Sequence, residues 1–315
     1  MNTFNVDRAG RGPLRGIVPP LVTPLRSRDE LDMAGLERLI EQVLSGGVHG
    51  VFILGTTGEA PSLSYRLRRE LIDRTCKLVD GRVPVLVGIT DTAFVESTGI
   101  ARHAAEAGAQ ALVVSTPYYF PVGQLELESY LEHLVTELPL PLFLYNMPMM
   151  TKVQFEPELV RRMMALDKVV GIKDSSGDLN YFKQIVDLAR GRADWTVLAG
   201  PENLLVETLR SGGHGGVNGG ANFYPALYVE LYKAVTSGDG AREAELVKQL
   251  GQVAEIYHIG KYASAVVKGI KCALSLMGIC DDCLAEPFSP FRAPERERVR
   301  RVLEKVGLIP AKGDT

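Results

Sequence analysis

Short apolar runs alternate with longer amphipathic segments along most of this sequence. Eight runs are rich in Val, Ile and Leu without polar alternation, which is typical of strands buried on both faces of a parallel sheet. Pro19 and Pro20 weaken the first run as a strand. The predicted strands are Gly16–Leu21, Gly50–Leu54, Val83–Val87, Ala111–Val114, Leu142–Tyr145, Val169–Lys173, Thr196–Ala199 and Gly215–Asn218.

Amphipathic segments between these runs predict helices. Strand–helix–strand units connect with right-handed crossovers, and eight of them match a closed (β/α)₈ TIM barrel of roughly 250 residues. A doubly wound open sheet competes with this fold, but no G-x-G-x-x-G motif follows Val18. The predicted helices are Met33–Ser45, Tyr65–Val79, Val95–Ala107, Leu125–Leu138, Pro157–Leu166, Leu179–Arg190 and Glu202–Arg210.

From Ala221 onward the pattern becomes purely helical, which indicates a C-terminal helical extension to the α/β barrel. We therefore predict a loose N-terminal extension over residues 1–14, the barrel over 15–222, and the last barrel helix with the C-terminal helices over 223–315. The predicted helices of this last part are Pro225–Thr236, Ala241–His258, Tyr262–Met277 and Ala293–Val306.

Composition argues against several classes of protein. The chain has 315 residues, with 35 Lys and Arg against 38 Asp and Glu, so its formal charge is −3. Neither nucleic acid nor a membrane is expected as a partner from this balance. No apolar run is long enough to span a membrane, and the first sixteen residues lack the apolar region of a signal peptide.

The cysteines and histidines predict neither disulfides nor a metal site. Four cysteines are too few for a disulfide scaffold in a chain of this length, and they fit reduced thiols in the cytoplasm. Cys280 and Cys283 form a lone C-x-x-C pair, and the five histidines show no ligand spacing. We expect no bound metal.

Polar residues collect after the predicted strands, where the active site of a barrel enzyme lies. Hydroxyl groups and one amine dominate this set, and we expect them to meet at one end of the barrel. The segments are Gly55-Thr56-Thr57-Gly58-Glu59, Thr116-Pro117-Tyr118-Tyr119, Tyr145-Asn146, Lys173-Asp174-Ser175-Ser176-Gly177, Gly200-Pro201-Glu202 and Asn218-Gly219-Gly220.

Among these residues, Lys173 is the strongest candidate for a catalytic nucleophile. Alternation along the strand places Val169, Gly171 and Lys173 on one face, and Gly171 would leave space beside the lysine inside the barrel. Desolvation there disfavours the ammonium form, and a neutral amine is the nucleophile that Schiff-base chemistry needs. The competing interpretation is a structural lysine that reaches solvent or pairs with Asp174 or Glu59.

The other motifs at the strand ends each allow a functional and a structural interpretation. The Gly55–Gly58 turn offers backbone N–H groups and hydroxyls that can hold a carboxylate, or it is a Gly-rich turn with a capping threonine. Tyr145 and Tyr119 carry phenols that can move protons, or they are packed aromatics. The glycines of residues 211–220 suggest a phosphate site, or they serve tight turns and close packing at the barrel mouth; most of them precede the last strand, on the wrong face for a phosphate, and only Gly219 and Gly220 are well placed.

The order and spacing of four of these motifs resemble the dihydrodipicolinate synthase / N-acetylneuraminate lyase family of class I pyruvate aldolases. The resemblance extends from about Arg15 to Pro310. The motifs are Gly55-Thr56-Thr57-Gly58-Glu59, Thr116-Pro117-Tyr118-Tyr119, Tyr145-Asn146-Met147-Pro148 and Gly171-Ile172-Lys173-Asp174.

This resemblance implies a lyase on a TIM barrel, assembled as a homotetramer that is a dimer of dimers. Lys173 matches the Schiff-base lysine and Tyr145 the phenol that shuttles protons. Thr56 and Thr57 match the groups that hold the carboxylate of a 2-oxo acid, and Thr56 also matches a relay hydroxyl. Tyr119 matches a relay tyrosine that enters the neighbouring subunit's site.

Further positions match the substrate pocket. Val217 falls beside the bound keto acid, and Ser175 and Glu202 are expected to bind substrate as well. Met150 stands where dihydrodipicolinate synthases carry an arginine that grips the carboxylate of the aldehyde, and a thioether cannot do so. Lys152 could replace that arginine only if the loop bends differently.

We therefore expect a Schiff-base lyase, either an aldolase or a dehydratase. Its substrates would be pyruvate-derived 2-oxo acids, such as 2-oxo-3-deoxy sugar acids or 4-hydroxy-2-oxoglutarate. Pyruvate and an aldehyde would be its small-molecule partners, and no cofactor is needed because the lysine itself supplies the electrophilic iminium. Dihydrodipicolinate synthase activity, a phosphate-binding isomerase and a non-catalytic sugar-acid sensor stay open as alternatives.

Overall fold

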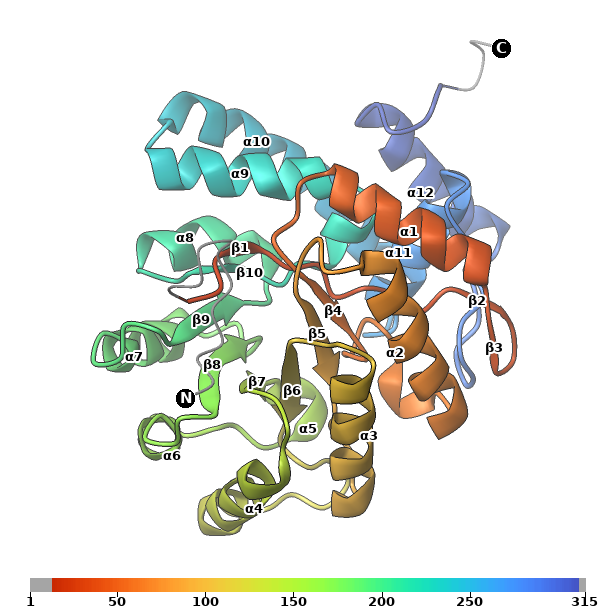
Figure 1. The fold of residues 1–315 in the computed structure, drawn as a ribbon. Coiled ribbons are helices and arrows are strands. Elements are labelled where there is room, and N and C mark those ends of the chain that lie inside the picture. Colours follow the sequence, from red (N-terminus) through yellow and green to blue (C-terminus); the bar gives the residue numbers. More distant parts are fainter. Residues whose placement is uncertain (1–12, 312–315) are drawn as a thin grey trace.

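A sheet of eight parallel strands forms the centre of the molecule (Figure 1). The computed structural model describes residues 13–311. Around the sheet the strand order is β1, β10, β9, β8, β7, β6, β5, β4. These strands are β1 (Gly16–Ile17), β4 (Val51–Ile53), β5 (Val85–Gly88), β6 (Ala111–Ser115), β7 (Leu142–Asn146), β8 (Val169–Asp174), β9 (Thr196–Ala199) and β10 (Gly215–Gly216).

The segment after β1 closes the sheet into a barrel. The Phe52 N–H donates to the Pro19 carbonyl at 3.0 Å, and the Leu21 N–H donates to the Phe52 carbonyl at 2.8 Å. Pro19 and Pro20 have no N–H to give to a ladder, which explains why β1 is only two residues long. The predicted α/β barrel with its C-terminal helices is confirmed.

Helices surround the strands, and most of them follow the predicted segments (Figure 1). Asp32, Ser64 and Asp178 each begin a helix by accepting a hydrogen bond from a backbone N–H of its first turn. The helices are α1 (Met33–Ser45), α2 (Tyr65–Val79), α3 (Phe94–Glu106), α4 (Gln124–Glu137), α6 (Pro157–Met163), α7 (Leu179–Ala189), α8 (Leu205–Arg210) and α9 (Pro225–Ser237).

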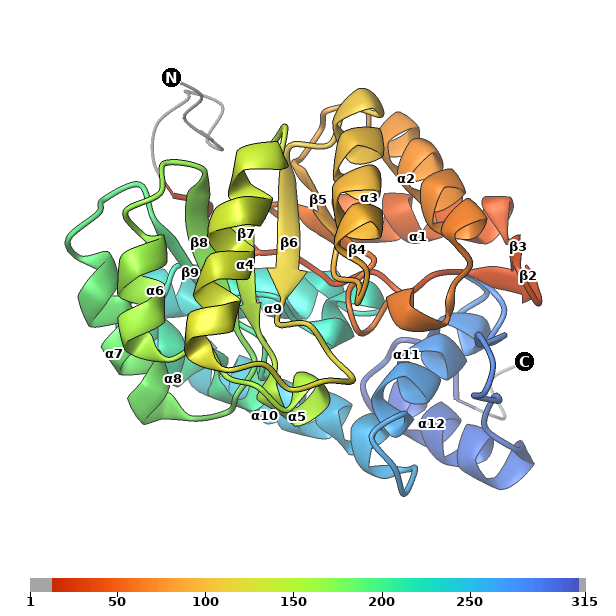
Figure 2. The same cartoon turned by 90° about the horizontal axis from the view of Figure 1, so that it is seen from below.

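Three further helices form the C-terminal part, namely α10 (Gly240–Ala254), α11 (Ala265–Leu276) and α12 (Ala293–Lys305). Figure 2 shows β6 pointing toward the end of the barrel where α5 (Pro148–Thr151) and the segment before α11 lie. The helix α5 and the segment before α11 therefore lie at the carboxyl ends of the strands, where the predicted site residues are placed.

Several boundaries differ from those predicted. The hairpin of β2 (Leu25–Ser27) and β3 (Glu30–Leu31) and the short helix α5 have no counterpart in the predicted elements, because two- to four-residue elements leave no periodic signal. A 3₁₀ turn over Glu255–His258 ends α10 early, and α11 begins at Ala265, not at Tyr262.

The predicted division of the chain at residues 14 and 222 stays a prediction, and residues 1–12 lie outside the described part. Within that part, Leu14 is buried and its N–H donates to the Thr196 hydroxyl at 2.9 Å. None of the helices that the structure describes is both long and apolar enough to cross a membrane.

A bulge corrects the face predicted for Val169. Phe143 of β7 pairs with Gly171 of β8, although its neighbour Leu142 pairs with Val169, so β8 carries one extra residue there. Val170 consequently packs inside the barrel with Phe143, whereas Val169 faces the helices. Gly171 and Lys173 keep the predicted inward face, since they follow the bulge.

Candidate active site

Lys173 lies near the carboxyl end of β8, and the side chains around it are aromatic. The residue is only 6% exposed. Its Nζ lies 3.9 Å from the centre of the Tyr145 ring and 5.1 Å from the centre of the Phe52 ring. A Cβ on Gly171 would come within 2.6 Å of the Phe143 ring, so the glycine provides the close packing below the lysine.

The two carboxylates considered as structural partners of Lys173 are engaged elsewhere. Asp174 accepts hydrogen bonds from Asn146 Nδ2 at 2.8 Å and from the Ser176 hydroxyl at 3.0 Å. Glu59 pairs with Lys271. Within residues 13–311, no carboxylate lies within ion-pair distance of Lys173. The amine is therefore buried without the neutralising partner that a structural lysine would have.

Tyr145 is the register partner of Lys173 on β7. Its hydroxyl lies 3.3 Å from Thr56 Oγ1. Burial raises the pKa of the Tyr145 phenol, but the charge of Lys173 and hydrogen bonds with Thr56, Lys173 and Ser175 outweigh that effect and bring the pKa below its ordinary value. A phenol of this kind gives up its proton more readily than a free tyrosine, as a proton shuttle requires.

The loop after β4 forms a tight turn beside these groups. The Glu59 N–H donates to the Thr56 carbonyl at 3.1 Å, and the Thr23 hydroxyl donates to the Gly58 carbonyl at 2.7 Å. Thr56 and Thr57 are half-buried within this turn. The turn thus holds two hydroxyls at the mouth of the barrel, where they can contact a small anion.

A cavity of about 480 Å³ opens at this end of the barrel. Barrel residues supply one part of its wall and the segment around α11 supplies the other. The Lys173 amino group does not line the cavity, but it lies against two of the lining rings, those of Phe52 and Tyr145. Characteristic lining residues are Thr56, Tyr118, Tyr145, Met150, Tyr262 and Phe288.

Charge is scarce on this wall. No Lys or Arg of the described chain lines the cavity, and its one carboxylate, Glu59, is paired with Lys271. Lys152 does not take the place of the missing arginine, because its Nζ turns away to donate to the Met149 carbonyl at 2.8 Å. Met150 lines the cavity as an apolar group.

Two further predicted substrate residues lie close to this centre. Ser175 contributes to the lowered pKa of the Tyr145 phenol, and Val217 is buried in the same inner cluster as Tyr145. Thr57 follows Thr56 in the turn, although it does not line the cavity. The roles predicted for these residues stay predictions.

Glu202 lies apart from the cavity. Its carboxylate accepts hydrogen bonds from the Gly220 N–H at 2.7 Å, from the Tyr257 hydroxyl at 2.9 Å and from the Tyr228 hydroxyl. Burial raises the pKa of Glu202, although hydrogen bonds from Tyr228, Gly220 and Tyr257 oppose the rise. These partners turn the carboxylate toward the C-terminal helices.

Tyr119 is not brought to Lys173 within one chain. It is 84% exposed with a left-handed φ of 81°, and its ring packs on Phe120 with the centroids 5.0 Å apart. Tyr118, its neighbour in sequence, lines the cavity instead. Tyr119 can therefore act in catalysis only if its side chain enters the active site of a second copy of the chain.

Sequence reasoning missed the part of the wall that comes from the C-terminal segments. Tyr262, Val267 and Phe288 line the cavity, and Lys271 anchors Glu59. These residues are more than 200 positions from Thr56, and no local pattern predicts that they return to the mouth of the barrel.

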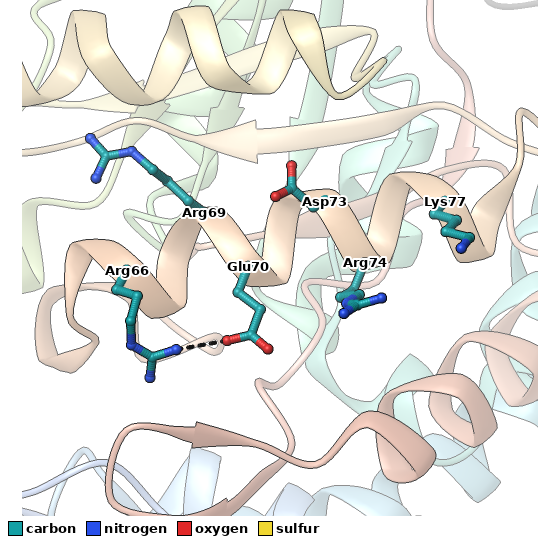
Figure 3. A pocket seen from close by; sticks show the side chains of 6 residues that line it. All are labelled: Arg66, Arg69, Glu70, Asp73, Arg74 and Lys77. Carbon is teal, nitrogen blue, oxygen red and sulfur yellow. Dashed lines mark hydrogen bonds and ion pairs between the residues drawn. The ribbon is translucent and has the colours of Figure 1, made fainter.

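A second, larger depression of about 590 Å³ lies on the outer face of α2 (Figure 3). Its residues share one exposed helix face, and Arg66 pairs with Glu70 across a turn. They offer no buried nucleophile, so we assign the chemistry to the barrel mouth. The six lining residues are Arg66, Arg69, Glu70, Asp73, Arg74 and Lys77.

Comparison with known proteins identifies relatives over nearly the whole chain. The model of the dihydrodipicolinate synthetase family matches residues 13–306. The 4-hydroxy-tetrahydrodipicolinate synthase of Phenylobacterium zucineum (strain HLK1) is 32% identical, over 94% of this chain and 98% of its own length. YagE of Escherichia coli (strain K12), a candidate 2-dehydro-3-deoxy-D-gluconate aldolase, is 32% identical over 93% of this chain and 97% of its own.

Solved structures agree with these matches. The dihydrodipicolinate synthase of Bacteroides thetaiotaomicron superposes with a TM-score of 0.91 at 49% identity, covering 94% of this chain and 99% of its own. YagE in complex with pyruvate superposes with a TM-score of 0.88 at 32% identity, covering 94% and 99% of the two chains. The first of these structures is a dihydrodipicolinate synthase, and YagE is described as a member of the dihydrodipicolinic acid synthase family.

Proposed function

Because this chain belongs to the dihydrodipicolinate synthetase family, we propose that it is a Schiff-base lyase that cleaves a pyruvate-derived 2-oxo acid into pyruvate and an aldehyde. The observation that carries this proposal is the Lys173 amine, which is buried against the ring of Tyr145 and has no carboxylate partner among residues 13–311. The pyruvate complex of YagE, a relative of the same fold, supports pyruvate as the common part of the substrate.

The mechanism begins when the Lys173 amine attacks the C2 carbonyl of the substrate. Loss of water gives an iminium, which can accept an electron pair. Tyr145 takes the proton from the C4 hydroxyl, the C3–C4 bond breaks, and its electrons move to the iminium nitrogen. An aldehyde leaves, and the enamine of pyruvate stays on the lysine.

The second half of the cycle releases pyruvate. The enamine takes a proton at C3, with Thr56 and a neighbouring subunit's Tyr119 relaying protons to and from Tyr145. Water then hydrolyses the imine and frees the Lys173 amine. Since the lysine acts as the electrophilic catalyst, this sequence requires neither a metal nor an organic cofactor.

Borohydride trapping with pyruvate tests the proposal directly. Reduction of the imine should add one pyruvate-derived group to the protein, and peptide mapping should place it on Lys173. Lys173→Ala should prevent the adduct. Lys152→Ala removes the exposed lysine near the cavity and should leave trapping unchanged. A folded, wild-type protein that gives no adduct would contradict the proposal and favour the sensor alternative.

The aldehyde part of the substrate is proposed to be uncharged. A distal carboxylate would need a cationic partner, and no Lys or Arg of the described chain lines the cavity. Hydroxyls of Ser62, Tyr118 and Ser264 do line it, and they can bond the hydroxyls of a sugar-derived chain. We therefore favour 2-oxo-3-deoxy sugar acids over 4-hydroxy-2-oxoglutarate, and over condensation with aspartate semialdehyde.

Cleavage assays would separate these substrates. 2-Oxo-3-deoxygluconate should release pyruvate faster than 4-hydroxy-2-oxoglutarate at equal concentration, and condensation of pyruvate with aspartate semialdehyde should be the slowest reaction. A preference for aspartate semialdehyde would overturn the assignment in favour of dihydrodipicolinate synthase, while leaving the Schiff-base chemistry in place.

The phosphate-binding alternative fits the structure poorly. A phosphate at Gly219 and Gly220 would need their backbone N–H groups, but the Gly220 N–H already donates to the Glu202 carboxylate at 2.7 Å. An anion placed there would also meet the charge of that carboxylate. We keep this alternative only as the outcome expected if phosphorylated sugars protect the protein and pyruvate does not.

We also propose a homotetramer in the cytoplasm, built as a dimer of dimers. The exposed apolar side chains of Tyr119, Phe120 and Leu125 supply a surface that a second copy can cover, and burial there would bring Tyr119 toward a neighbouring site. Sedimentation velocity tests the assembly. A monomer with full activity would contradict both the assembly and the relay role of Tyr119.

A further inference from the structure

A fully buried ion pair joins the loop after β4 to the C-terminal helices. The ammonium of Lys271, on α11, lies 2.5 Å from Glu59 Oε1, and the two side chains are 0% and 2% exposed. Lys271 Nζ also donates to the Cys283 carbonyl at 2.6 Å, while the Ala285 N–H donates to Glu59 Oε2 at 2.8 Å. The pair therefore ties together three segments that are distant in sequence.

This ion pair acts on the turn that carries Thr56 and Thr57. Glu59 ends that turn, because its N–H donates to the Thr56 carbonyl at 3.1 Å. Its backbone has a left-handed φ of 59°, which a residue other than glycine adopts only when its surroundings hold it there. The Lys271 ammonium and the Ala285 N–H hold the Glu59 side chain and thereby the end of the turn.

Stability alone is a weak reason for such a pair. Burying two charges removes them from water, and apolar residues of similar size often stabilise a fold as well or better. Within the described part of the chain, Glu59 Oε1 receives no well-directed hydrogen bond, so the charge of Lys271 is what compensates its burial. The arrangement is better explained by the need to fix one segment against another.

The geometry points to Lys271 as a positioning residue for substrate binding: through Glu59 it holds the Thr56–Thr57 turn in the shape that receives the carboxylate of the 2-oxo acid. This inference rests on the proposed function, because it takes the turn as the carboxylate subsite. Lys271 itself has no exposed surface, so it cannot be a second nucleophile.

The test compares pyruvate with methyl pyruvate, which has the same reactive carbonyl but no free carboxylate. Lys271→Met keeps the length of the side chain and removes its charge. We expect a roughly 10- to 100-fold rise in the pyruvate concentration needed for half-maximal borohydride trapping, and less than about a threefold change with methyl pyruvate. In cleavage assays the KM should rise more than kcat falls.

Two further variants separate positioning from general stability. The double variant Glu59→Gln, Lys271→Met removes both charges. It should recover part of the pyruvate trapping that Lys271→Met alone loses. Leu303→Ala leaves a cavity where the buried Leu303 of α12 packs, away from the turn. It should lower stability without changing the ratio between the half-maximal trapping concentrations of pyruvate and methyl pyruvate. If Lys271→Met does not fold, Glu59→Gln alone should still show the selective loss.

The outcomes are distinct. An equal loss for pyruvate and methyl pyruvate, or no loss for either, would overturn the positioning role of Lys271. A wild-type protein that cannot be trapped with pyruvate would overturn the proposed function itself. A selective loss with pyruvate supports both.

Discussion

The amino group of Lys173 lies 3.9 Å from the centre of the Tyr145 ring, and the two residues are register partners on β8 and β7. Neighbouring parallel strands thus present an amine and a phenol at the same level of the barrel. Because both side chains are buried, a change in the charge of one is felt strongly by the other.

Removing the Tyr145 hydroxyl should separate imine formation from bond cleavage. Tyr145→Phe keeps the ring against Lys173 but removes the proton shuttle, so borohydride trapping of pyruvate should persist while cleavage slows roughly 10²- to 10⁴-fold. Tyr118→Phe provides the comparison: Tyr118 lines the cavity but, within the described residues, its ring does not contact the Lys173 amine, so this variant should weaken substrate binding more than it slows bond cleavage. Similar losses in both variants would argue against a special role for Tyr145.

The pH dependence of cleavage should depend on Thr56. Burial raises the pKa of Tyr145, but Lys173 and the hydrogen bond with Thr56 outweigh it, so the phenolate forms at lower pH than in a free tyrosine. Thr56→Val removes one group that favours the phenolate and should move the rising limb of the kcat profile to higher pH. An ultraviolet titration of the phenolate, corrected with Tyr145→Phe, should shift in the same direction.

Thr57→Val is the matched control for that experiment. Its hydroxyl is predicted to hold the substrate carboxylate but makes no hydrogen bond to Tyr145 within the described residues. It should therefore raise KM and leave the pH profile of kcat in place. A profile that moves equally in both variants would indicate a general disturbance of the turn.

Met150→Arg should broaden the range of aldehydes. Met150 lines the cavity, and a guanidinium there can bond a distal carboxylate, which we expect to favour anionic over neutral aldehydes by roughly 10- to 100-fold relative to wild type. Met149→Arg is a matched control, since Met149 is 63% exposed and is not part of the cavity wall. The measurement is the ratio of the initial rates with anionic and with neutral aldehydes, each condensed with pyruvate. If both variants change this ratio equally, only the net charge of the protein matters.

Stability should fall between about pH 6.5 and 4 because of His214. Its Nδ1 accepts a hydrogen bond from the Val197 N–H at 2.9 Å, and burial lowers the pKa of His214 to about 4. In this range the unfolded chain binds a proton that the folded chain does not, so unfolding becomes easier as the pH falls. We expect a loss of about 1–2 kcal/mol, reduced from the full shift because the ring is partly exposed.

Urea unfolding at several pH values would measure this effect. His214→Asn keeps an oxygen that can accept from Val197 and cannot become charged, so its stability should be less sensitive to acid. His258→Asn changes an exposed histidine and should follow the wild type. An acid response of His214→Asn equal to that of the wild type would show that other groups dominate.

The sequence by itself determined the architecture and the centre of the site. Buried strands alternating with amphipathic helices have few ways to cover both faces of a parallel sheet, so the barrel could be predicted from local patterns alone. The same reasoning placed Lys173 and Tyr145 at strand ends, and the barrel topology brings such ends together. Element boundaries were predicted less well, because α11 begins at Ala265 and not at the predicted Tyr262.

Tertiary structure decided what depends on contacts between distant segments. The bulge that turns Val170 inward arises from the pairing of two strands, which alternation within one strand cannot reveal. Likewise, Glu59 meets Lys271 and Glu202 meets Tyr257 only because the C-terminal helices fold back over the strand ends. A buried charge must find a partner wherever the fold supplies one, and the position of that partner along the chain is set by packing and not by spacing.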